Sequence, residues 1–351
     1  MKYEKNWPDW HELFNTSITS AEELSEHYLF DHKDMQNIID KFPMRINLYY
    51  LSLIKTYGDP IWKQAVPDSM EIKDYLNAED PLCEEIQSPV KNLIHRYPDR
   101  VLFSVSSQCA MLCRFCMRKR KMGTNFIVDD HTIKEGLYYI RSNKCVRDVI
   151  ISGGDPFLLE NDVLNEIMNK LRLIPHVEII RIHTRVPCTL PQRITKHLAS
   201  ILKKYHPVFI NTHFNHYDEI TPEAEKACGT LVDAGIPVGC QTVLLKGVND
   251  SPFVMSRLMQ NLQKIRVTPY YIHHADAVKG TAHFRTSIYK GIEILKELYR
   301  YVPDCIVPHY MIDLPGGGGK IPIGLEYNKN IIKKNLTIKN FQGNFFQYPD
   351  Q

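Results

Sequence analysis

The sequence predicts an α/β fold, a full or partial (β/α) barrel. Short apolar runs rich in β-branched residues recur from about residue 100, and helical stretches separate them. Strands that are apolar on both faces and alternate with helices are typical of a parallel sheet. The runs are 101–105, 149–151, 179–182, 208–211, 238–245, 267–272 and 305–312. Seven such units across about 210 residues are too many for a small open sheet and fit a barrel.

Polar residues follow most of these runs, where a barrel places its chemistry, at the carboxyl ends of the strands. One residue, Gln241, lies within the fifth run instead. The residues that follow the other runs, in chain order, are Cys109, then Gly153, Gly154 and Asp155, then His183 and Arg185, then His213, Asp276 and Asp313. We therefore expect these side chains to share one rim of the barrel.

The segments outside the barrel are expected to differ from it. Residues 1–95 have a helical pattern, with helix starts at a Ser20–Glu23 capping box and at His32, and no chemistry is visible there. Residues 96–315 are expected to form the barrel. Residues 316–351 carry a glycine loop and a tail, in which strand-like LTIKNF and NFFQY around Gln342 and Gly343 predict a terminal hairpin.

The composition of this 351-residue chain, 44% hydrophobic and 24% charged, is that of an ordinary globular protein. The N-terminus lacks the layout of a signal peptide and no apolar run would span a membrane, so we expect a soluble cytoplasmic protein. The net charge of +3 is too small to favour a nucleic-acid partner. Nine cysteines without a signal favour thiol or metal chemistry over disulfides. Six stand alone and are expected to be small buried hydrophobes: Cys83, Cys145, Cys188, Cys228, Cys240 and Cys305.

The other three cysteines, Cys109, Cys113 and Cys116, have the spacing C-x3-C-x2-C. A structural zinc site needs four ligands, and no second pair of cysteines is present at a suitable spacing. Three cysteines on a [4Fe-4S] cluster leave one iron without a protein ligand, and a substrate can coordinate there. The sequence therefore predicts an iron–sulfur cluster with an open iron.

This spacing, with Phe115 before the last cysteine, resembles that of the radical SAM superfamily. The resemblance implies a partial barrel of the radical SAM type, in which the open iron binds S-adenosylmethionine and the cluster cleaves it to a 5'-deoxyadenosyl radical. Gly153, Gly154 and Asp155 resemble the GGE-type motif that approaches the methionine ammonium. On its own, a glycine pair after a strand would equally be a turn between a strand and a helix.

Lys320 follows four glycines in a loop that is not a Walker A motif, because Leu314 and Ile321 stand where that motif needs glycine and Ser or Thr. A lysine on a mobile glycine loop can instead form a Schiff base with pyridoxal phosphate. PGGGGK resembles the lysine 2,3-aminomutase family, as do seven further stretches in the same order, over about residues 10–345. They are HRYPDRVL at 95–102, CRFCMRKR at 113–120, SGGDP at 152–156, THFNH at 212–216, LLKGVND at 244–250, RVTPYYI at 266–272 and GTAHFR at 280–285.

The resemblance implies roles for individual residues. Lys320 would hold the pyridoxal 5'-phosphate, whose phosphate Arg96 and Arg100 would bind. Arg118 would contact the substrate carboxylate, while the remaining members of the basic run, residues 119–121, are expected to be solvated. His213 and Gln241 match positions around S-adenosylmethionine. Without the resemblance, the two phosphate arginines would read as helix-end surface charge, and His213 and Gln241 as hydrogen-bonded rim residues.

Asp276 and Asp313 bear on the substrate. Two carboxylates in a partly buried pocket repel each other unless a cation lies between them. In lysine-specific members of the family, two aspartates at these positions bind the ε-ammonium, which favours L-lysine and the product β-lysine. Arginine would satisfy the same argument, and a branch that makes β-lysine for elongation factor P shares the chemistry. A non-catalytic iron–sulfur protein with a decayed site is the alternative from another class.

Three further expectations come from the family pattern. Longer members bind zinc through C-terminal cysteines, but no cysteine follows Cys305, so structural zinc is not expected. A reducing partner such as flavodoxin or ferredoxin and a homo-oligomeric assembly are expected. Lysine-specific members have Tyr-Gln-Cys before the first aspartate, where this chain has His273, His274 and Ala275. His273 is therefore expected to change the cofactor contacts.

Overall fold

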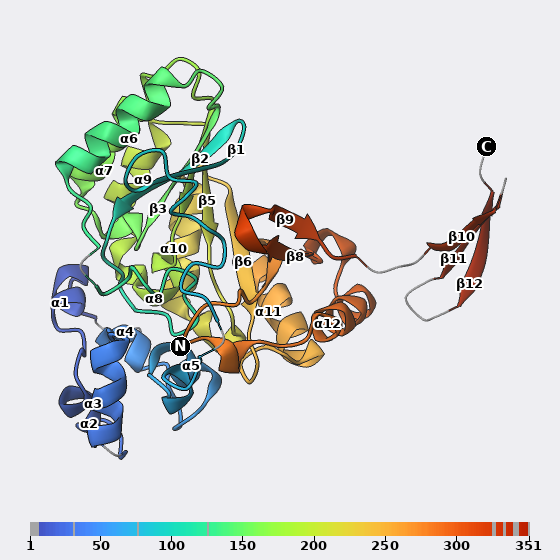
Figure 1. The fold of residues 1–351 in the computed structure, drawn as a ribbon, viewed down its shortest axis with the longest axis horizontal. Helices are drawn as coiled ribbons and strands as arrows, with labels where there is room; N and C mark the ends of the chain where they lie inside the picture. The colour runs from blue at the N-terminus through green and yellow to red at the C-terminus, as the bar shows by residue number, and fades with distance from the viewer. Residues whose placement is uncertain are drawn as a thin grey trace.

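The computed structural model describes residues 7–30, 32–75, 77–124, 126–324, 328–332, 335–339 and 344–349. A nine-stranded sheet forms the centre of the fold, and its strands lie side by side in chain order from β1 to β9. The seven strands β2 to β8 run parallel, and β1 and β9 pair antiparallel at the two edges. The sheet curls into an open barrel with helices outside it (Figure 1), which confirms the predicted partial (β/α) barrel. The strands are β1 (Leu93–Tyr97), β2 (Arg100–Ser106), β3 (Asp148–Gly153), β4 (Ile179–His183), β5 (Val208–Thr212), β6 (Val238–Leu244), β7 (Thr268–His274), β8 (His309–Leu314) and β9 (Gly319–Pro322).

Two expectations about strands were wrong in detail. The last run was expected to be extended from residue 305, but Cys305 lies in a 3-10 turn, η6 (Asp304–Ile306), and β8 begins only at His309. Pro308 lacks the N–H that a central strand donates to its neighbour, so the strand starts after it. Residues 93–95 were expected to be helical, but they belong to β1, which pairs with β2.

Except for the short α8, whose four residues are all buried, the outer helices bury one apolar stripe each. Helix α7 illustrates the pattern, because its buried side chains, Leu164, Ile167, Met168 and Leu171, recur at helical spacing. Side-chain caps begin several of these helices, such as Thr195 before α9 and Ser287 before α12. The helices are α6 (Asp130–Ser142), α7 (Asn161–Arg172), α8 (Val186–Thr189), α9 (Lys196–Lys203), α10 (Pro222–Asp233), α11 (Pro252–Lys264) and α12 (Ile288–Tyr301).

The N-terminal helices gather at one end of the barrel (Figure 1). They are α1 (Trp10–Asn15), α2 (Ala21–Ser25), α3 (His32–Lys41), α4 (Leu48–Leu51) and α5 (Pro60–Ala65). The predicted capping box of Ser20 and Glu23 is present at α2, and α3 begins at His32 as expected. Beyond Ala65 the segment is mostly turns, with one 3-10 turn, η1 (Ser69–Glu71), so the region is less helical than predicted.

This N-terminal region holds the loop that carries the three cysteines. Asn47 Nδ2 donates to the carbonyl of Ala110 at 3.0 Å, and the N–H of Leu112 donates to the carbonyl of Arg45 at 3.1 Å. A buried ion cluster completes the contact: the guanidinium of Arg114 and the ammonium of Lys119 both bind the carboxylate of Glu71, each with a 2.6 Å contact. The three side chains are between 0% and 7% exposed.

The basic run after the cysteines is therefore not solvated, and the expectation for Lys119, Arg120 and Lys121 was wrong. Lys119 is buried against Glu71. Arg120 and Lys121 both contact Glu85, at 3.0 and 2.6 Å. A run of basic residues usually lies on a solvated face. Here the acidic partners lie more than 30 positions earlier in the chain, so the local sequence does not reveal them.

We expect Glu71→Ala to destabilise the fold strongly. Removing the carboxylate leaves the two buried cations without their counter-charge, and breaking a buried pair costs about 3–5 kcal/mol. The free energy of unfolding from urea titrations followed by circular dichroism measures this loss. Glu178→Ala, which removes an exposed partner of Arg147, is the matched control and should leave the midpoint nearly unchanged. Equal losses in both variants would contradict the assignment.

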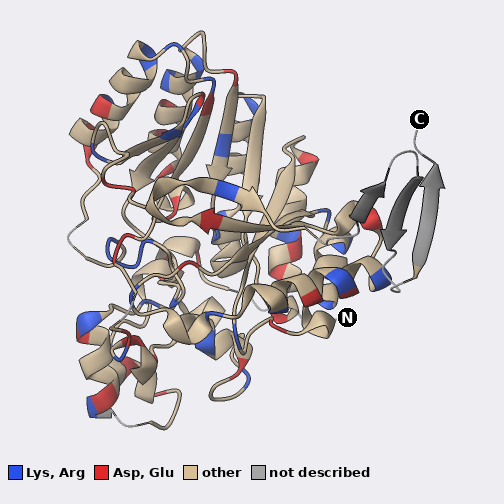
Figure 2. Ribbon diagram, turned by 45° about the vertical axis from the view of Figure 1, so that its right-hand side comes forward, with Lys and Arg blue, Asp and Glu red and all other residues tan. Residues whose placement is uncertain are grey.

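A second sheet ends the chain. Its antiparallel strands are β10 (Asn328–Ile332), β11 (Asn335–Lys339) and β12 (Phe345–Pro349). The pairing of β11 with β12 agrees with the predicted hairpin, and its turn at Gln342 and Gly343 lies outside the described residues. In the described part of the chain, no helix has the length and apolarity that a bilayer span requires. Acidic and basic residues are interspersed over the described helices (Figure 2).

Candidate active site

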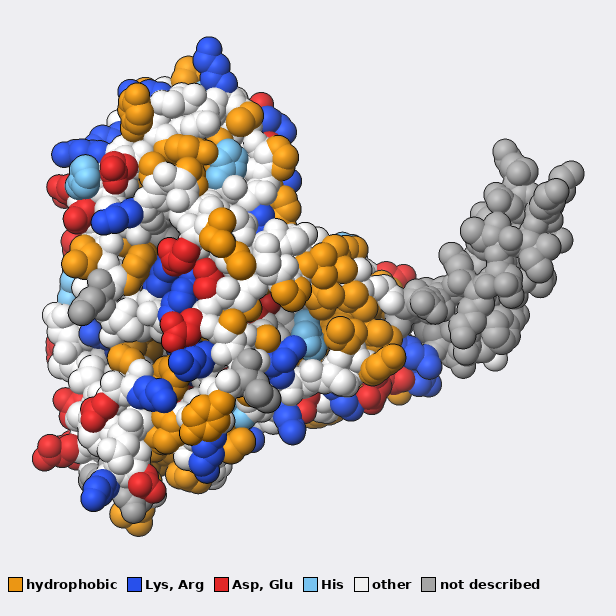
Figure 3. Space-filling model, viewed as in Figure 1, with side chains coloured by type: hydrophobic (Ala, Val, Ile, Leu, Met, Phe, Trp, Pro, Cys, Tyr) orange, Lys and Arg blue, Asp and Glu red, His pale blue; other side chains and the backbone are white. Residues whose placement is uncertain are grey.

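One cavity of about 730 Å³ opens where the parallel strands end. Charged side chains of both signs meet in the middle of the face that Figure 3 shows. Every residue that the sequence analysis singled out for chemistry lines this cavity. They are Arg96, Arg100, Cys109, Cys113, Cys116, Arg118, Gly153, Gly154, Asp155, His213, Gln241, Asp276, Asp313 and Lys320. Residues spread over 225 positions of the chain are thus brought to one place, as the barrel rule predicts.

The three cysteines lie on the loop that follows β2. Burial raises the pKa of Cys109 well above its usual range, and burial together with the neighbouring Cys113 raises the pKa of Cys116 to about 11. The thiols of Cys109 and Cys116 are therefore protonated at neutral pH, and metal binding must displace their protons. Among the described residues, no three metal-ligating side chains are already drawn together around one point. Three thiols on one short loop, facing a shared cavity, are nevertheless a donor set suited to a [4Fe-4S] cluster with one open iron.

The glycine pair after β3 permits a close approach of two backbone segments. Gly153 has φ +134°, and a Cβ there would lie 2.3 Å from the carbonyl oxygen of Ser106. A Cβ at Gly154 would lie 2.2 Å from the carbonyl oxygen of Gln108. The two glycines thus allow the end of β3 to lie against the chain that leads into the cysteine loop. This contact is an intramolecular reason for the motif, in addition to the approach to a ligand that the resemblance implies.

The carboxylate of Asp155 accepts its hydrogen bonds from groups of the protein itself. Its carboxylate accepts from the hydroxyl of Thr184 at 2.6 Å and from the N–H groups of Phe157, Arg185 and Val186 at 3.0, 2.7 and 3.2 Å. Burial raises the pKa of Asp155 to about 6, against the opposing effect of these bonds. In this structure Asp155 ties the end of β3 to the turn after β4, although it also lines the cavity.

Arg118 is held by a carboxylate that the sequence analysis did not identify. Its Nε lies 3.1 Å from both carboxylate oxygens of Glu84, and its Nη2 donates to Oε1 at 2.9 Å. Both side chains are largely buried, at 13% and 3% exposed. Glu84 lies 34 positions before Arg118 and belongs to no recognisable motif. In the sequence, only the neighbouring acidic residues indicate that a basic partner exists. The Nη1 end of Arg118 has no contact with Glu84, which leaves a donor for a ligand.

Arg96 and Arg100, the candidates for a phosphate site, lie at opposite ends of the turn between β1 and β2. Arg96 is mostly buried; its Nε donates to Gln87 at 2.7 Å, and its Nη1 lies 3.5 Å from Asp313. Arg100 is more exposed, lies over the ring of Tyr97 and donates to Asp99. Both line the cavity. Gln87 positions Arg96 from the N-terminal region, and sequence reasoning missed it.

Lys320 lies in β9, directly after the glycine turn, rather than on a free loop. Its ammonium forms an ion pair with Asp313, its partner across the β8–β9 pairing. Its N–H donates to the hydroxyl of Tyr97 at 2.9 Å. Gly316 and Gly317 adopt φ +68° and +83°, and a Cβ at Gly317 would lie 2.3 Å from Gln87. The glycines therefore build a tight turn, and the lysine side chain is the part that projects into the cavity.

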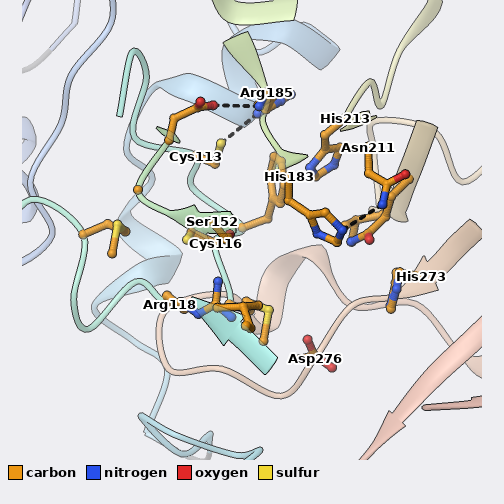
Figure 4. Close-up of a pocket in the computed structure, with 18 of the residues that line it drawn as sticks. Cys113, Cys116, Arg118, Ser152, His183, Arg185, Asn211, His213, His273 and Asp276 are labelled. Atoms are coloured by element: carbon orange, nitrogen blue, oxygen red, sulfur yellow. Dashed lines mark hydrogen bonds between the residues drawn. The ribbon is translucent and has the colours of Figure 1, made fainter. Parts of the chain in front are cut away.

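Asp276 follows β7 and faces the cavity (Figure 4), which Asp313 also lines. Burial and the negative charge of Asp313 together raise the pKa of Asp276 to about 6. Asp313 is neutralised by Lys320 and by Arg96, whereas no hydrogen bond or ion pair to the carboxylate of Asp276 is found among the described residues. Asp276 is thus a carboxylate whose charge is destabilised until a cation approaches it.

Four histidines line the same cavity, and Figure 4 labels three of them, His183, His213 and His273. Burial, with Arg181 near the first and Arg185 near the second, lowers the pKa of His183 and of His213 to about 3. Burial also lowers the pKa of His273 well below its usual range, and its Nε2 has no hydrogen-bond partner in the described structure. All three rings are therefore neutral near pH 7, and His273 offers a free ring nitrogen to a ligand.

The six lone cysteines do not behave alike. Cys188, Cys228 and Cys240 are buried as expected, but Cys145 and Cys305 are exposed and Cys83 is intermediate. For the two exposed thiols, the expectation of a small buried hydrophobe was wrong. Both lie in turns directly after a charged residue, Lys144 in the first case and Asp304 in the second.

Known proteins resemble this chain over nearly its whole length. A family model described as the radical SAM superfamily matches residues 103–258. An L-lysine 2,3-aminomutase of Methanococcus maripaludis is 47% identical over 98% of this chain and 82% of its own length. One of Acetoanaerobium sticklandii is 45% identical, covering 99% of this chain and 86% of the relative. A glutamate 2,3-aminomutase of Clostridioides difficile is 40% identical over 99% of this chain and 84% of its own length.

Proposed function

The chain belongs to the lysine 2,3-aminomutase family of the radical SAM superfamily, and from this premise we propose that it moves the α-amino group of L-lysine to C3, giving β-lysine. One observation carries the choice of substrate: a cavity that contains the three cysteines and Lys320 also presents Arg118 and the carboxylates of Asp276 and Asp313. A free amino acid with a cationic side chain matches these charges at both of its ends.

Arg118 supports binding of the α-carboxylate. A guanidinium binds a carboxylate through its fork of N–H donors, and here Glu84 already occupies one side of that fork. Glu84 fixes the orientation of the guanidinium and leaves the Nη1 side for the substrate. Because Glu84 also cancels most of the charge of Arg118, we expect the site to select a carboxylate by its hydrogen-bond geometry.

Asp276 and Asp313 support binding of the side-chain ammonium. Without a ligand, Lys320 forms an ion pair with Asp313, whereas no ion pair of the described structure includes Asp276. If Lys320 held pyridoxal phosphate, its contact with Asp313 would be vacated, and the ε-ammonium of lysine could take that place between the two aspartates. An acidic side chain would instead meet these two carboxylates, which disfavours glutamate by like-charge repulsion.

The cofactors supply the difficult chemistry when bound: the cluster with S-adenosylmethionine supplies hydrogen-atom abstraction, and pyridoxal phosphate supplies a ring that delocalises an unpaired electron. The residues of this chain bind and orient. Cys109, Cys113 and Cys116 would hold the cluster, Lys320 with Arg96 and Arg100 would hold pyridoxal phosphate, and Gly153, Gly154, His213 and Gln241 would contact S-adenosylmethionine. The neutral rings of His183, His213 and His273 add no charge that would repel the substrate cation.

We expect the affinity for lysine to rise as the pH rises through about 6. Asp276 is protonated below its pKa of about 6 and cannot pair with the ammonium there, while the lysine side chain stays charged over this range. Asp276→Asn should weaken binding roughly thirtyfold at pH 8 and flatten the pH profile. Isothermal titration calorimetry on the reconstituted, unreduced enzyme measures both, with norleucine as the uncharged control ligand. Equal losses for lysine and norleucine would count against a role for this carboxylate.

Product analysis tests the function as a whole. The protein would be reconstituted anaerobically with iron, sulfide, pyridoxal phosphate and S-adenosylmethionine, reduced, and incubated separately with lysine, arginine and glutamate. β-Lysine as the dominant product is the expected result, and a β-isomer from arginine alone would replace lysine by arginine in the proposal. Detection of no β-amino acid at all from an enzyme that carries its full cluster would refute it.

The setting of the reaction belongs to the same proposal. The chain would act in the cytoplasm as a homo-oligomer and receive its electron from a partner such as flavodoxin or ferredoxin. β-Lysine could serve free metabolism or the modification of elongation factor P, and the chemistry at this site is the same for both.

A further inference from the structure

Arg185 connects a cluster cysteine to buried side chains from distant parts of the chain. It follows β4, at the start of α8, and is 8% exposed. Its Nη1 donates to the Sγ of Cys113 at 2.8 Å (Figure 4). Its Nη2 donates to Glu219 and to Gln64, both at 2.7 Å. The guanidinium is therefore fixed between one thiol and two buried acceptors.

A second layer of residues holds this arrangement rigid. The carboxylate of Glu219 is fully buried and also accepts from the hydroxyl of Tyr50 at 2.6 Å and from the N–H groups of Asn215 and His216 at 2.6 and 2.9 Å. Tyr50 lies in α4 and Gln64 in α5. The N-terminal helices, in which the sequence alone shows no chemistry, thus reach the cysteine loop through this network.

We propose that Arg185 is a positioning residue that raises the reduction potential of the cluster through its contact with Cys113. The proposal rests on the cluster assigned under the proposed function. Reduction adds negative charge to the cluster, and a cationic N–H donor at a cysteine sulfur stabilises the reduced form more than the oxidised form. The 2.8 Å contact makes Cys113 the point where the protein acts on the cluster.

A purely structural role would explain the geometry less well. Arg193 is also buried, and its Nε and Nη2 donate to backbone carbonyls and to Asn161, as expected of an arginine that only braces the fold. By contrast, the guanidinium of Arg185 donates to no backbone carbonyl in the described structure, and its three acceptors are the side chains of Cys113, Gln64 and Glu219. One of its donors is thus placed on a thiol, which bracing the backbone does not require.

The test measures the midpoint potential of the reconstituted cluster by electron paramagnetic resonance, without any amino acid substrate. Arg185→Gln alone would leave Glu219 as an unpaired buried charge, so the main variants are Arg185→Lys and the double variant R185Q/E219Q. Removing the donor should lower the potential. At the wild-type midpoint, we expect the ratio of reduced to oxidised cluster in R185Q/E219Q to fall about tenfold, which is about 59 mV for a one-electron couple. Arg185→Lys, which keeps the charge, should recover part of this shift.

Arg172→Gln is the matched control. Arg172 binds only backbone carbonyls and does not line the cavity, so its loss affects stability but should leave the potential unchanged. An unchanged potential and an unchanged spectrum in R185Q/E219Q at full iron content would overturn the proposal. The proposal would also be overturned if both Arg185 variants failed to bind iron while they retained the native circular dichroism. Arg185 would then be needed for the cluster to bind and not for its reduction potential. Failure of the function itself would appear separately, as a wild-type cluster of normal potential without β-lysine.

Discussion

Lys320→Ala should abolish the visible absorbance that pyridoxal phosphate acquires when an enzyme lysine binds it, and catalysis with it. The only link from this chain to the cofactor aldehyde would be lost, and loss of a covalent catalytic group typically lowers kcat on the order of 10⁴-fold or more. Since Lys320 also neutralises Asp313, the variant leaves two aspartates in the cavity without that cation. Absorbance spectra after gel filtration and product assays under saturating lysine measure the two effects.

Lys279→Ala is the matched control for this variant. Lys279 is also an ion-paired lysine of the barrel region, but its partner is the exposed Glu79, and it does not line the cavity. It should keep both the spectrum and the activity. Persistence of the visible band in Lys320→Ala, with its loss in a different lysine variant, would show that another residue holds the cofactor.

Cys116→Ala should leave the protein folded but unable to keep a [4Fe-4S] cluster. Three thiolates are the minimum that holds such a cluster with one open iron, and alanine cannot replace a ligand. Because the N-terminal helices brace the loop through its backbone and through Arg114, the fold does not depend on this thiol. Iron and sulfide analysis, together with the loss of the visible absorbance of the cluster, checks the outcome, and S-adenosylmethionine cleavage should fall to background.

Cys145→Ala is the control, since Cys145 is an exposed thiol outside the cavity. It should bind a full complement of iron and cleave S-adenosylmethionine at the rate of the unaltered protein. A Cys116→Ala protein with four irons per chain would show that a different residue completes the ligand set.

The barrel and the rim residues could be predicted because each depends on a local pattern. β-Branched runs mark strands wherever they occur, and the barrel rule then gathers their carboxyl ends, so Cys109 and Asp313 could be assigned to one rim. The start of β8 could not be predicted in this way, because an apolar run spans residues 305–312 and only the proline within it decides where pairing begins. The strand β1 was missed for a related reason, since a single short edge strand gives no repeating pattern.

The charge partners within the site could not be predicted. Nothing near Arg118 indicates that Glu84 binds it, and nothing near Lys119 indicates burial against Glu71. These pairs join segments from the N-terminal region to the cysteine loop. From the local sequence alone, each of these charged side chains would be predicted to be exposed to solvent. For Cys145 and Cys305 the error is the opposite one, since they were predicted to be buried and are exposed. An apolar residue type by itself does not determine whether a side chain is buried.

The sequence by itself determined what kinds of chemistry are present. The spacing of Cys109, Cys113 and Cys116 and the glycines before Lys320 are features of short segments. They can therefore be recognised without knowledge of the fold. The tertiary structure alone decided which groups act on one another: Lys320 with Asp313, Arg118 with Glu84, and Arg185 with Cys113. Ligand type depends on residue identity and spacing along the chain. The charge state and orientation of a side chain depend on burial and on partners within a few ångströms, and those are set only when distant segments fold together.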